Sequence, residues 1–184
     1  FFVLILGLYV GLPFIAPVFM EWGWISPAKA IYAFYATQCH QMPQRSFFFF
    51  GSNVMYSLDE IQLAGQNVDA MKVLRRFIGN PEMGWKVAWS DRMVYMYGSA
   101  LVFSLLWRPL RKKIRDLPIW GFILFLLPLA LDGTTHFISD LLSGYGHGFR
   151  YDNAWLAVLT RYSLPYDFYH GDAFGTFNSI MRLI

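Results

Sequence analysis

Long apolar runs separated by polar, aromatic-rich segments make up the chain. Residues 1–20 contain no charged side chain, and about 20 mostly apolar residues are enough to cross a bilayer as a helix. Two further apolar runs follow, and a last one begins at residue 177. The pattern predicts an all-α membrane protein with three to four transmembrane helices, at about residues 1–24, 89–107, 117–138 and 177–184.

A short basic stretch between the second and third predicted helices sets their orientation. Residues 108–116, RPLRKKIRD, contain five basic residues and one acid. Short basic loops stay on the cytoplasmic side of a membrane. We therefore expect a multi-pass protein of the cell inner membrane, with the 108–116 loop in the cytoplasm and segments 25–88 and 139–176 on the outer face.

The first outer segment carries its own structural signals. Ser46–Phe50 and Val54–Ser57 flank a Gly-Ser-Asn turn, which predicts a short hairpin. Val68–Ile78 places apolar residues on one helical face, which predicts an amphipathic helix. We expect one membrane domain over residues 1–184. Both chain ends lie inside apolar runs, so we expect a piece of a longer polypeptide in which the last helix is cut short.

Composition supports lipid as the surrounding medium. Of the 184 residues, 56% are hydrophobic, 20% aromatic and 15% charged, whereas a soluble domain carries about 25% charged residues. The net charge of +3 is local, and the basic loop needs no nucleic-acid partner to explain it. A single cysteine excludes an internal disulfide and a zinc site built from several thiolates. Walker, GxSxG, HExxH and dinucleotide motifs are absent, which favours a non-enzymatic role.

Two short polar segments could carry chemistry. Cys39 and His40 are soft-metal ligands, but the favoured interpretation is a hydrogen-bonded turn in which a carboxylate or a lipid phosphate neutralises Arg45. Asp132 and His136 are four residues apart, so they share one helix face, and an acid within a membrane span needs a partner. A metal site would require four residues to converge: Cys39, His40, Asp132 and His136. The alternative is a structural polar cluster made of Arg45, Asp91, Arg92 and Asp132, in which Asp132 pairs with Arg92.

The aromatic content suggests a hydrophobic ligand. Aromatic and apolar clefts bind flat or polyene molecules, such as a carotenoid, a quinone or a (bacterio)chlorophyll. The alternative is an aromatic belt at the membrane interface together with ordinary packing. The candidate cofactor-binding residues are Phe47, Phe48, Phe49, Phe50, Trp120, Phe125 and His136.

Four short motifs resemble those of a known family. Members of a family of small prokaryotic multi-pass membrane proteins, defined only as a domain of unknown function, carry Cys-His-x-x-Pro-x-Arg-Ser-Phe. That motif is matched here by Cys39, His40, Pro43, Arg45, Ser46 and Phe47. A Pro-x-x-x-Asp-Gly-x-x-(Gln or His) motif is matched by Pro128, Asp132, Gly133 and His136, and an Asn-x-x-x-Arg motif by Asn178 and Arg182.

The remaining family motif departs from the pattern. It reads Cys-x-Arg-(Cys or Asp)-x-x-Ile-Tyr and opens a membrane helix, and this chain has Ser90 and Met93 in place of the two cysteines. The replacement implies that any metal or redox work done by those thiols is lost here. The resemblance implies a fold and a membrane location rather than a reaction.

Together these features predict a non-enzymatic integral membrane subunit of a larger complex. We expect it to pack against the lipid bilayer and other membrane subunits and to bind a hydrophobic cofactor. A photosynthetic reaction-centre or light-harvesting assembly is one such complex. The alternative hypothesis is a metal- or thiol-dependent membrane enzyme with its site at the outer face.

Overall fold

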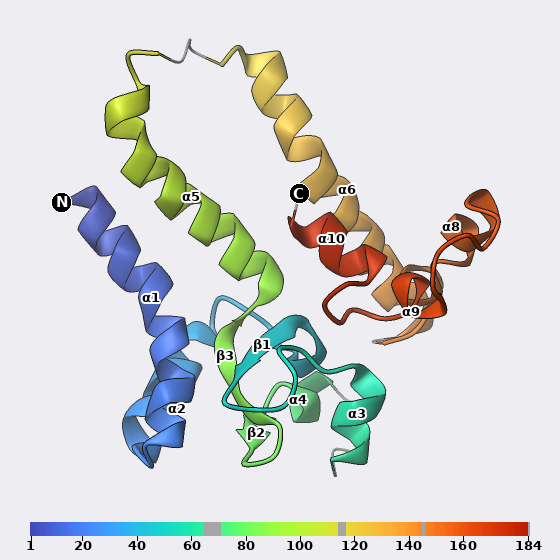
Figure 1. The fold of residues 1–184 in the computed structure, drawn as a ribbon, viewed down its shortest axis with the longest axis horizontal. Helices are drawn as coiled ribbons and strands as arrows, with labels where there is room; N and C mark the ends of the chain where they lie inside the picture. Colours follow the sequence, from blue (N-terminus) through green and yellow to red (C-terminus); the bar gives the residue numbers. More distant parts are fainter. Residues whose placement is uncertain (65–70, 114–116, 145, 184) are drawn as a thin grey trace.

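Three long helices rise from a folded base. The computed structural model describes residues 1–64, 71–113, 117–144 and 146–183. The long helices are α1 (Phe2–Glu21), α5 (Asp91–Leu110) and α6 (Ile119–Ser143). Figure 1 shows the N-terminus and the connection from α5 to α6 toward one end of the molecule, and the strands with helices α2 and α3 at the other.

The base contains a three-stranded antiparallel sheet in the order β1-β3-β2. Its strands are β1 (Ser46–Phe49), β2 (Gly79–Asn80) and β3 (Gly84–Ser90). Gly84 has a φ of +76°, and a Cβ there would overlap the carbonyl group of Phe49. Because only glycine tolerates both conditions, this residue allows β3 to begin against the end of β1.

The core lies where α1 and α2 (Ile25–Tyr35) pack on β3. Trp89 of β3 is fully buried, and its ring contacts Tyr9, Tyr35 and Tyr97. The Tyr35 hydroxyl donates to the Tyr9 carbonyl oxygen at 2.7 Å, which ties α2 to α1. Aromatic rings from three helices therefore enclose one strand tryptophan.

A second apolar cluster lies under the other side of the base. It joins the short helices α3 (Leu58–Leu63) and α4 (Met71–Leu74) to the sheet. Ser57 and Glu60 form a capping box at the start of α3, which fixes where that helix begins. The buried members are Met42, Phe48, Tyr56, Ile61, Leu74, Phe77 and Met83.

Short helices follow α6 and return the chain to the base. In order they are α7 (Phe149–Asp152), α8 (Ala154–Leu159), α9 (Tyr166–Tyr169) and α10 (Phe177–Leu183). Helix α10 packs against both α5 and α6, whereas α5 and α6 make few contacts with each other. The C-terminal helix therefore joins the two long helices near the base (Figure 1).

The predicted fold class was wrong. The chain is not an all-α protein with three to four membrane spans: about 63% of the residues that the structure describes are helical, and they also form the three-stranded sheet. In the described part of the chain, α1 and α6 alone are long and apolar enough to cross a membrane. Helix α5 carries Asp91 and Arg92 in its first turn, and the seven residues of α10 span roughly 10 Å.

The predicted hairpin within the first outer segment was also wrong. Strand β1 pairs with β3, in the register Phe48↔Lys86 and Phe49↔Trp85. The proposed partner strand, Val54–Ser57, contributes one hydrogen bond, from the Phe48 amide to the Val54 carbonyl oxygen. Residues 54–57 instead lead into the capping box of α3. Of the predicted amphipathic helix Val68–Ile78, residues 68–70 lie outside the described residues, and the helix observed there is the single turn α4.

Candidate functional site

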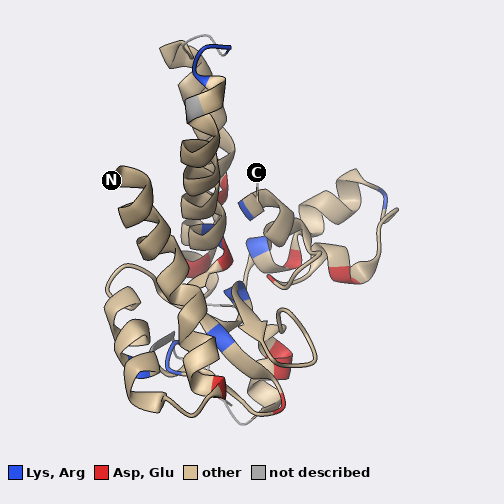
Figure 2. Ribbon diagram, turned by 60° about the vertical axis from the view of Figure 1, so that its left-hand side comes forward, with Lys and Arg blue, Asp and Glu red and all other residues tan. Residues whose placement is uncertain are grey.

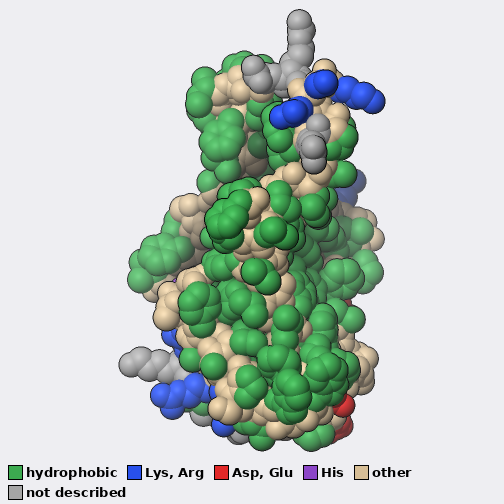
Figure 3. Space-filling model, turned by 90° about the vertical axis from the view of Figure 1, so that its left-hand side faces the viewer, with side chains coloured by type: hydrophobic (Ala, Val, Ile, Leu, Met, Phe, Trp, Pro, Cys, Tyr) green, Lys and Arg blue, Asp and Glu red, His purple; other side chains and the backbone are tan. Residues whose placement is uncertain are grey.

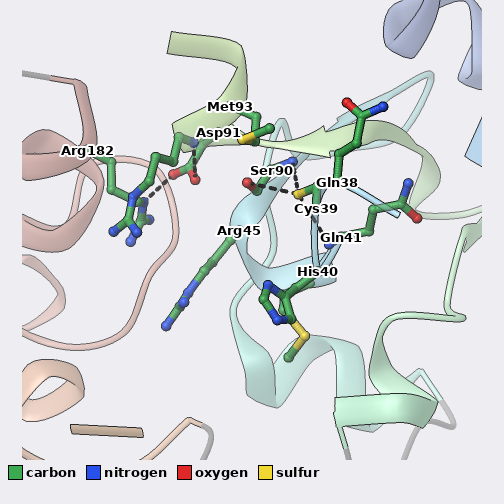
Figure 4. A pocket seen from close by; sticks show the side chains of 11 residues that line it. Gln38, Cys39, His40, Gln41, Arg45, Ser90, Asp91, Met93 and Arg182 are labelled. Atoms are coloured by element: carbon green, nitrogen blue, oxygen red, sulfur yellow. Dashed lines mark hydrogen bonds and ion pairs between the residues drawn. The ribbon is translucent and has the colours of Figure 1, made fainter. Parts of the chain in front are cut away.

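A small cavity lies between the segment before β1 and the first turn of α5. It has a volume of about 190 Å³, and its lining includes Cys39, His40, Ser90, Met93 and Arg182 (Figure 4). The positions of two family-like motifs, around Cys39 and around Ser90, therefore meet in space.

Cys39 acts here as a hydrogen-bonding group. It is buried, and its Sγ lies 3.3 Å from the Ser90 Oγ. The backbone amides of Gln41 and Ser90 each donate to this sulfur at 3.4 Å. These contacts join the turn after α2 to the end of β3, as in a hydrogen-bonded turn.

Hydrogen bonds from Lys86 and Gln41 stabilise the same turn. Lys86 is fully buried, and its Nζ donates to the carbonyl oxygens of Gln41 and Arg75 at 2.7 and 2.8 Å. The Gln41 amide donates to the carbonyl oxygens of Tyr32 and Ala88. Burial lowers the pKa of the Lys86 amine to about 7, because few groups replace the water that a charged amine loses.

Beside the cavity, Asp172 is the centre of a buried ion network. Its carboxylate accepts from the Arg45 Nε and the Arg182 Nη1, both at 2.8 Å. Arg182 also donates from Nε to Asp91 at 2.5 Å. Burial alone would raise the pKa of Asp172, but Arg45 and Arg182 together hold it well below its usual range.

A second centre of the network is Asp132 on α6. Arg150 donates to it from Nη2 at 2.7 Å, Arg92 forms an ion pair with it, and the His136 Nε2 lies 3.6 Å away. The two centres are linked because Arg45 donates to the Tyr151 hydroxyl and reaches within 3.5 Å of the His136 Nδ1.

The formal charges of this ion network cancel. Its ion pairs connect the short 3-10 helix η1 (Pro43–Arg45), α5, α6, α7 and α10 with the loop before α10. The network therefore forms the junction between the sheet and the C-terminal helices. Within the described residues the network contains four aspartates and four arginines: Asp91, Asp132, Asp140, Asp172, Arg45, Arg92, Arg150 and Arg182.

Local structure explains how these side chains reach one another. Asp132, His136 and Asp140 are spaced by four residues, so α6 presents them on one face. Asn153 has a φ of +43°, and its amide donates to the carbonyl oxygen of Tyr169 at 2.7 Å. Asn178 donates to the Gly171 carbonyl oxygen at 2.9 Å. These two asparagines shape the loops that present Arg150 and Asp172.

The structure brings the predicted polar cluster together, but not the predicted metal ligands. Arg45, Asp91, Arg92 and Asp132 all belong to the ion network, and Arg92 pairs with Asp132. Among the residues that the structure describes, no three His, Cys, Asp or Glu side chains are placed to hold a metal ion. Cys39 and His40 line the cavity, whereas Asp132 and His136 lie among arginines.

The predicted cofactor residues occupy separate places. Phe48 is buried in the second apolar cluster, and Phe47 and Phe49 pack against Tyr95 and Phe14. Phe50 is exposed at the turn that follows β1. Trp120 and Phe125 are exposed on the first half of α6, while His136 is buried in the ion network. A single pocket therefore does not unite these seven residues.

Sequence reasoning missed several members of the ion network. Asp140 lies four residues after His136, so the sequence spacing could have predicted that it shares one helix face with Asp132 and His136. Arg150, Tyr151 and Asp172 lie in the predicted outer segment 139–176, and nothing in their local pattern indicates burial.

Comparison with known proteins gives one similarity of note. The chain is 32% identical over 134 residues to an uncharacterized protein, MJ1492, of Methanocaldococcus jannaschii. The matched region covers 68% of this chain and 64% of the relative, so the chain spans less than two thirds of that protein's length. No family model matches the chain, and no solved structure matches it. The family resemblance stays a prediction.

Proposed function

We propose that the chain is a non-enzymatic membrane subunit whose helices α1 and α6 are inserted in a lipid bilayer, where α6 contacts hydrophobic partners. The observation that carries the proposal is the exposure of apolar side chains on the first half of α6. Its six consecutive residues 122–127 are each between 43% and 73% exposed, and all are Phe, Ile or Leu. Six residues pass around the whole circumference of a helix, which turns once every 3.6 residues.

An apolar helix exposed on every side needs an apolar environment. The buried core helix of a soluble protein can be as long and as apolar as these two helices. However, only 17% of the most apolar stretch of α6 and only 22% of that of α1 are buried. Leaving such side chains in water would cost about 25 cal/mol for each Å². Lipid, or the membrane helices of a partner, removes that cost.

The rest of the surface supports the same arrangement. Hydrophobic side chains cover most of the face that carries α1, and charged side chains gather toward its ends (Figure 3). The basic connection after α5, with Arg111, Lys112 and Lys113 exposed, lies at the end away from the sheet (Figure 1). Lysines and arginines favour the cytoplasmic side of a membrane, which supports placing this end of the molecule at the cytoplasmic face of the cell inner membrane.

In this arrangement the ion network has a mechanical role. Its junction joins α6 to the base through Asp132 and Asp140, at the half of the helix that faces α7 and α10. The exposed half then projects from a fixed point. Removing one partner from a charge-balanced, buried ion network costs much of its stability. The intact network therefore holds α6 at a defined position for docking.

A hydrophobic cofactor is part of the proposal. Trp120 and Phe125 on the exposed half of α6 offer aromatic faces to a carotenoid, quinone or chlorin held against a partner, as in a photosynthetic core. The competing hypothesis, a metal- or thiol-dependent enzyme, has less support, because the sulfur of Cys39 already accepts hydrogen bonds in a structural turn.

Two measurements test the proposal. After alkaline carbonate washing, the protein should remain with membranes and float with added liposomes; release into the soluble fraction would contradict membrane insertion. Organic-solvent extraction of the natively purified protein should then yield a stoichiometric pigment or quinone. Recovery of ordinary phospholipid alone would contradict the cofactor part and leave insertion intact.

A further inference from the structure

A large open cleft lies apart from the helices proposed to enter the membrane. It has a volume of about 1090 Å³ and runs between α3 on one side and α7, α9 and the loop before α10 on the other. Gly146 approaches α3 closely, because a Cβ there would overlap the side chain of Leu58. The two walls, distant in sequence, therefore meet at this point and enclose a groove.

The cleft is acidic, because its described lining contains aspartates and a glutamate but no lysine or arginine. Asp59 and Glu60 of α3 face it from one wall, and Asp152 and Asp167 from the other. None of these four carboxylates forms an ion pair with a lysine or arginine among the described residues, and the described lining contains neither residue type. Acidic residues on α3 and in the C-terminal part are coloured red in Figure 2.

A buried side chain in the lining has no partner. Gln44 is 2% exposed, and within the described part of the chain neither its Oε1 nor its Nε2 makes a hydrogen bond. Buried amides are nearly always hydrogen-bonded, so an unsatisfied one at the edge of a cleft indicates a missing partner. It offers both an acceptor and two donors to a ligand.

The spacing of the acids decides which kind of cation fits. The lining holds carboxylates and two histidines, yet no three such groups in the described residues stand close enough to hold a metal ion. A compact divalent ion would therefore leave most of these four carboxylates without a cation beside them. The exposed rings of Tyr166 and Phe174 add aromatic faces to the lining, and such faces attract ammonium groups.

We propose that this acidic cleft binds an extended organic cation of the polyamine class. Its separated ammonium groups would lie near the carboxylates of both walls, and one amine would meet the amide of Gln44. The proposal does not depend on membrane insertion, because the cleft is formed by α3 and the C-terminal loops.

Calorimetric titration of the full-length, detergent-solubilised protein with spermidine tests the proposal. We expect saturable binding at low salt, and a loss of affinity of about tenfold in the double variant D59N/D167N, since each exposed ion pair contributes modestly. Both positions are exposed, so the variant should fold. The matched control is Glu82→Gln, an exposed acid outside the cleft, which should bind as the parent does.

Other titrants separate the remaining explanations. Ethanolamine, which has the single amine of a lipid headgroup, should bind much more weakly than spermidine, and magnesium should not compete. Gln44→Leu should melt at a higher temperature than the parent without ligand but show a smaller spermidine-induced shift. Equal binding of magnesium, equal binding by D59N/D167N, or an unchanged shift in Gln44→Leu would overturn the proposal.

Discussion

Substituting Asp172 by asparagine tests the ion network most severely. The carboxylate is 1% exposed and accepts hydrogen bonds from two arginines, each at 2.8 Å. Asparagine keeps the size of the side chain but removes the charge, which leaves Arg45 and Arg182 buried with less compensation. Breaking a buried ion pair from one side costs about 3–5 kcal/mol.

The pH at which this loss is measured follows from the sign of the pKa shift. The pKa of Asp172 is lower in the folded protein than in the unfolded chain. Its contribution to stability is therefore complete above the unfolded value of about 3.9 and is lost as the pH falls through the folded value. At neutral pH the substitution should show its whole effect.

Thermal unfolding in detergent or nanodiscs supplies the measurement. A loss of 3–5 kcal/mol should lower the midpoint by about 10 °C in a chain of this length. Asp167→Asn is the matched control, because this exposed aspartate belongs to the same part of the chain and should change stability by about 0.5 kcal/mol or less. A midpoint for Asp172→Asn equal to that of the control would mean that the Asp172 carboxylate does not stabilise the fold.

Three other predictions follow from single residues. The folded protein releases the Lys86 proton near pH 7, whereas the unfolded chain keeps it. The free energy of unfolding should therefore rise by about 3 kcal/mol between roughly pH 7 and 9. Denaturation curves of Lys86→Met that show the same rise with pH would contradict this. Gly84→Ala should destabilise the sheet by about 2–4 kcal/mol in denaturant titrations, whereas Gly98→Ala, with open space in α5, should be neutral or stabilising. Leu124→Arg should make the free energy of membrane insertion about 3 kcal/mol less favourable and lower the membrane-bound fraction in carbonate extraction. The control Leu63→Arg introduces the same charge at the exposed end of α3 and should leave that fraction unchanged.

The long helices were the part of the fold that the sequence could predict. Residues 1–20 and 117–138 are apolar over many turns, and the observed helices α1 and α6 cover all but the first one or two residues of these runs. Strand β3 was missed because its seven residues, GWKVAWS, are too few for a periodicity to separate strand from helix. Its aromatic ending was assigned instead to the start of the next helix.

The ion network shows why the site could be predicted only in part. Asp132 and Arg92 were recognisable because charges in apolar helices need partners. Arg45 and Asp172 lie 127 positions apart, and their contact depends on how the loop before α10 folds back. No local pattern records such a contact, so the centre of the network appeared only in the structure.

The most direct test of membrane insertion is a spin-label scan of residues 122–127 on a Cys39→Ser background in nanodiscs. Collision with oxygen reports lipid, and collision with a water-soluble nickel chelate reports water. Insertion of α6 predicts oxygen-accessible, nickel-protected labels at all six positions, except where a partner excludes both, and a nickel-accessible label at the control position Leu63. Nickel access at residues 122–127 would show that this half of α6 lies in water and not in lipid.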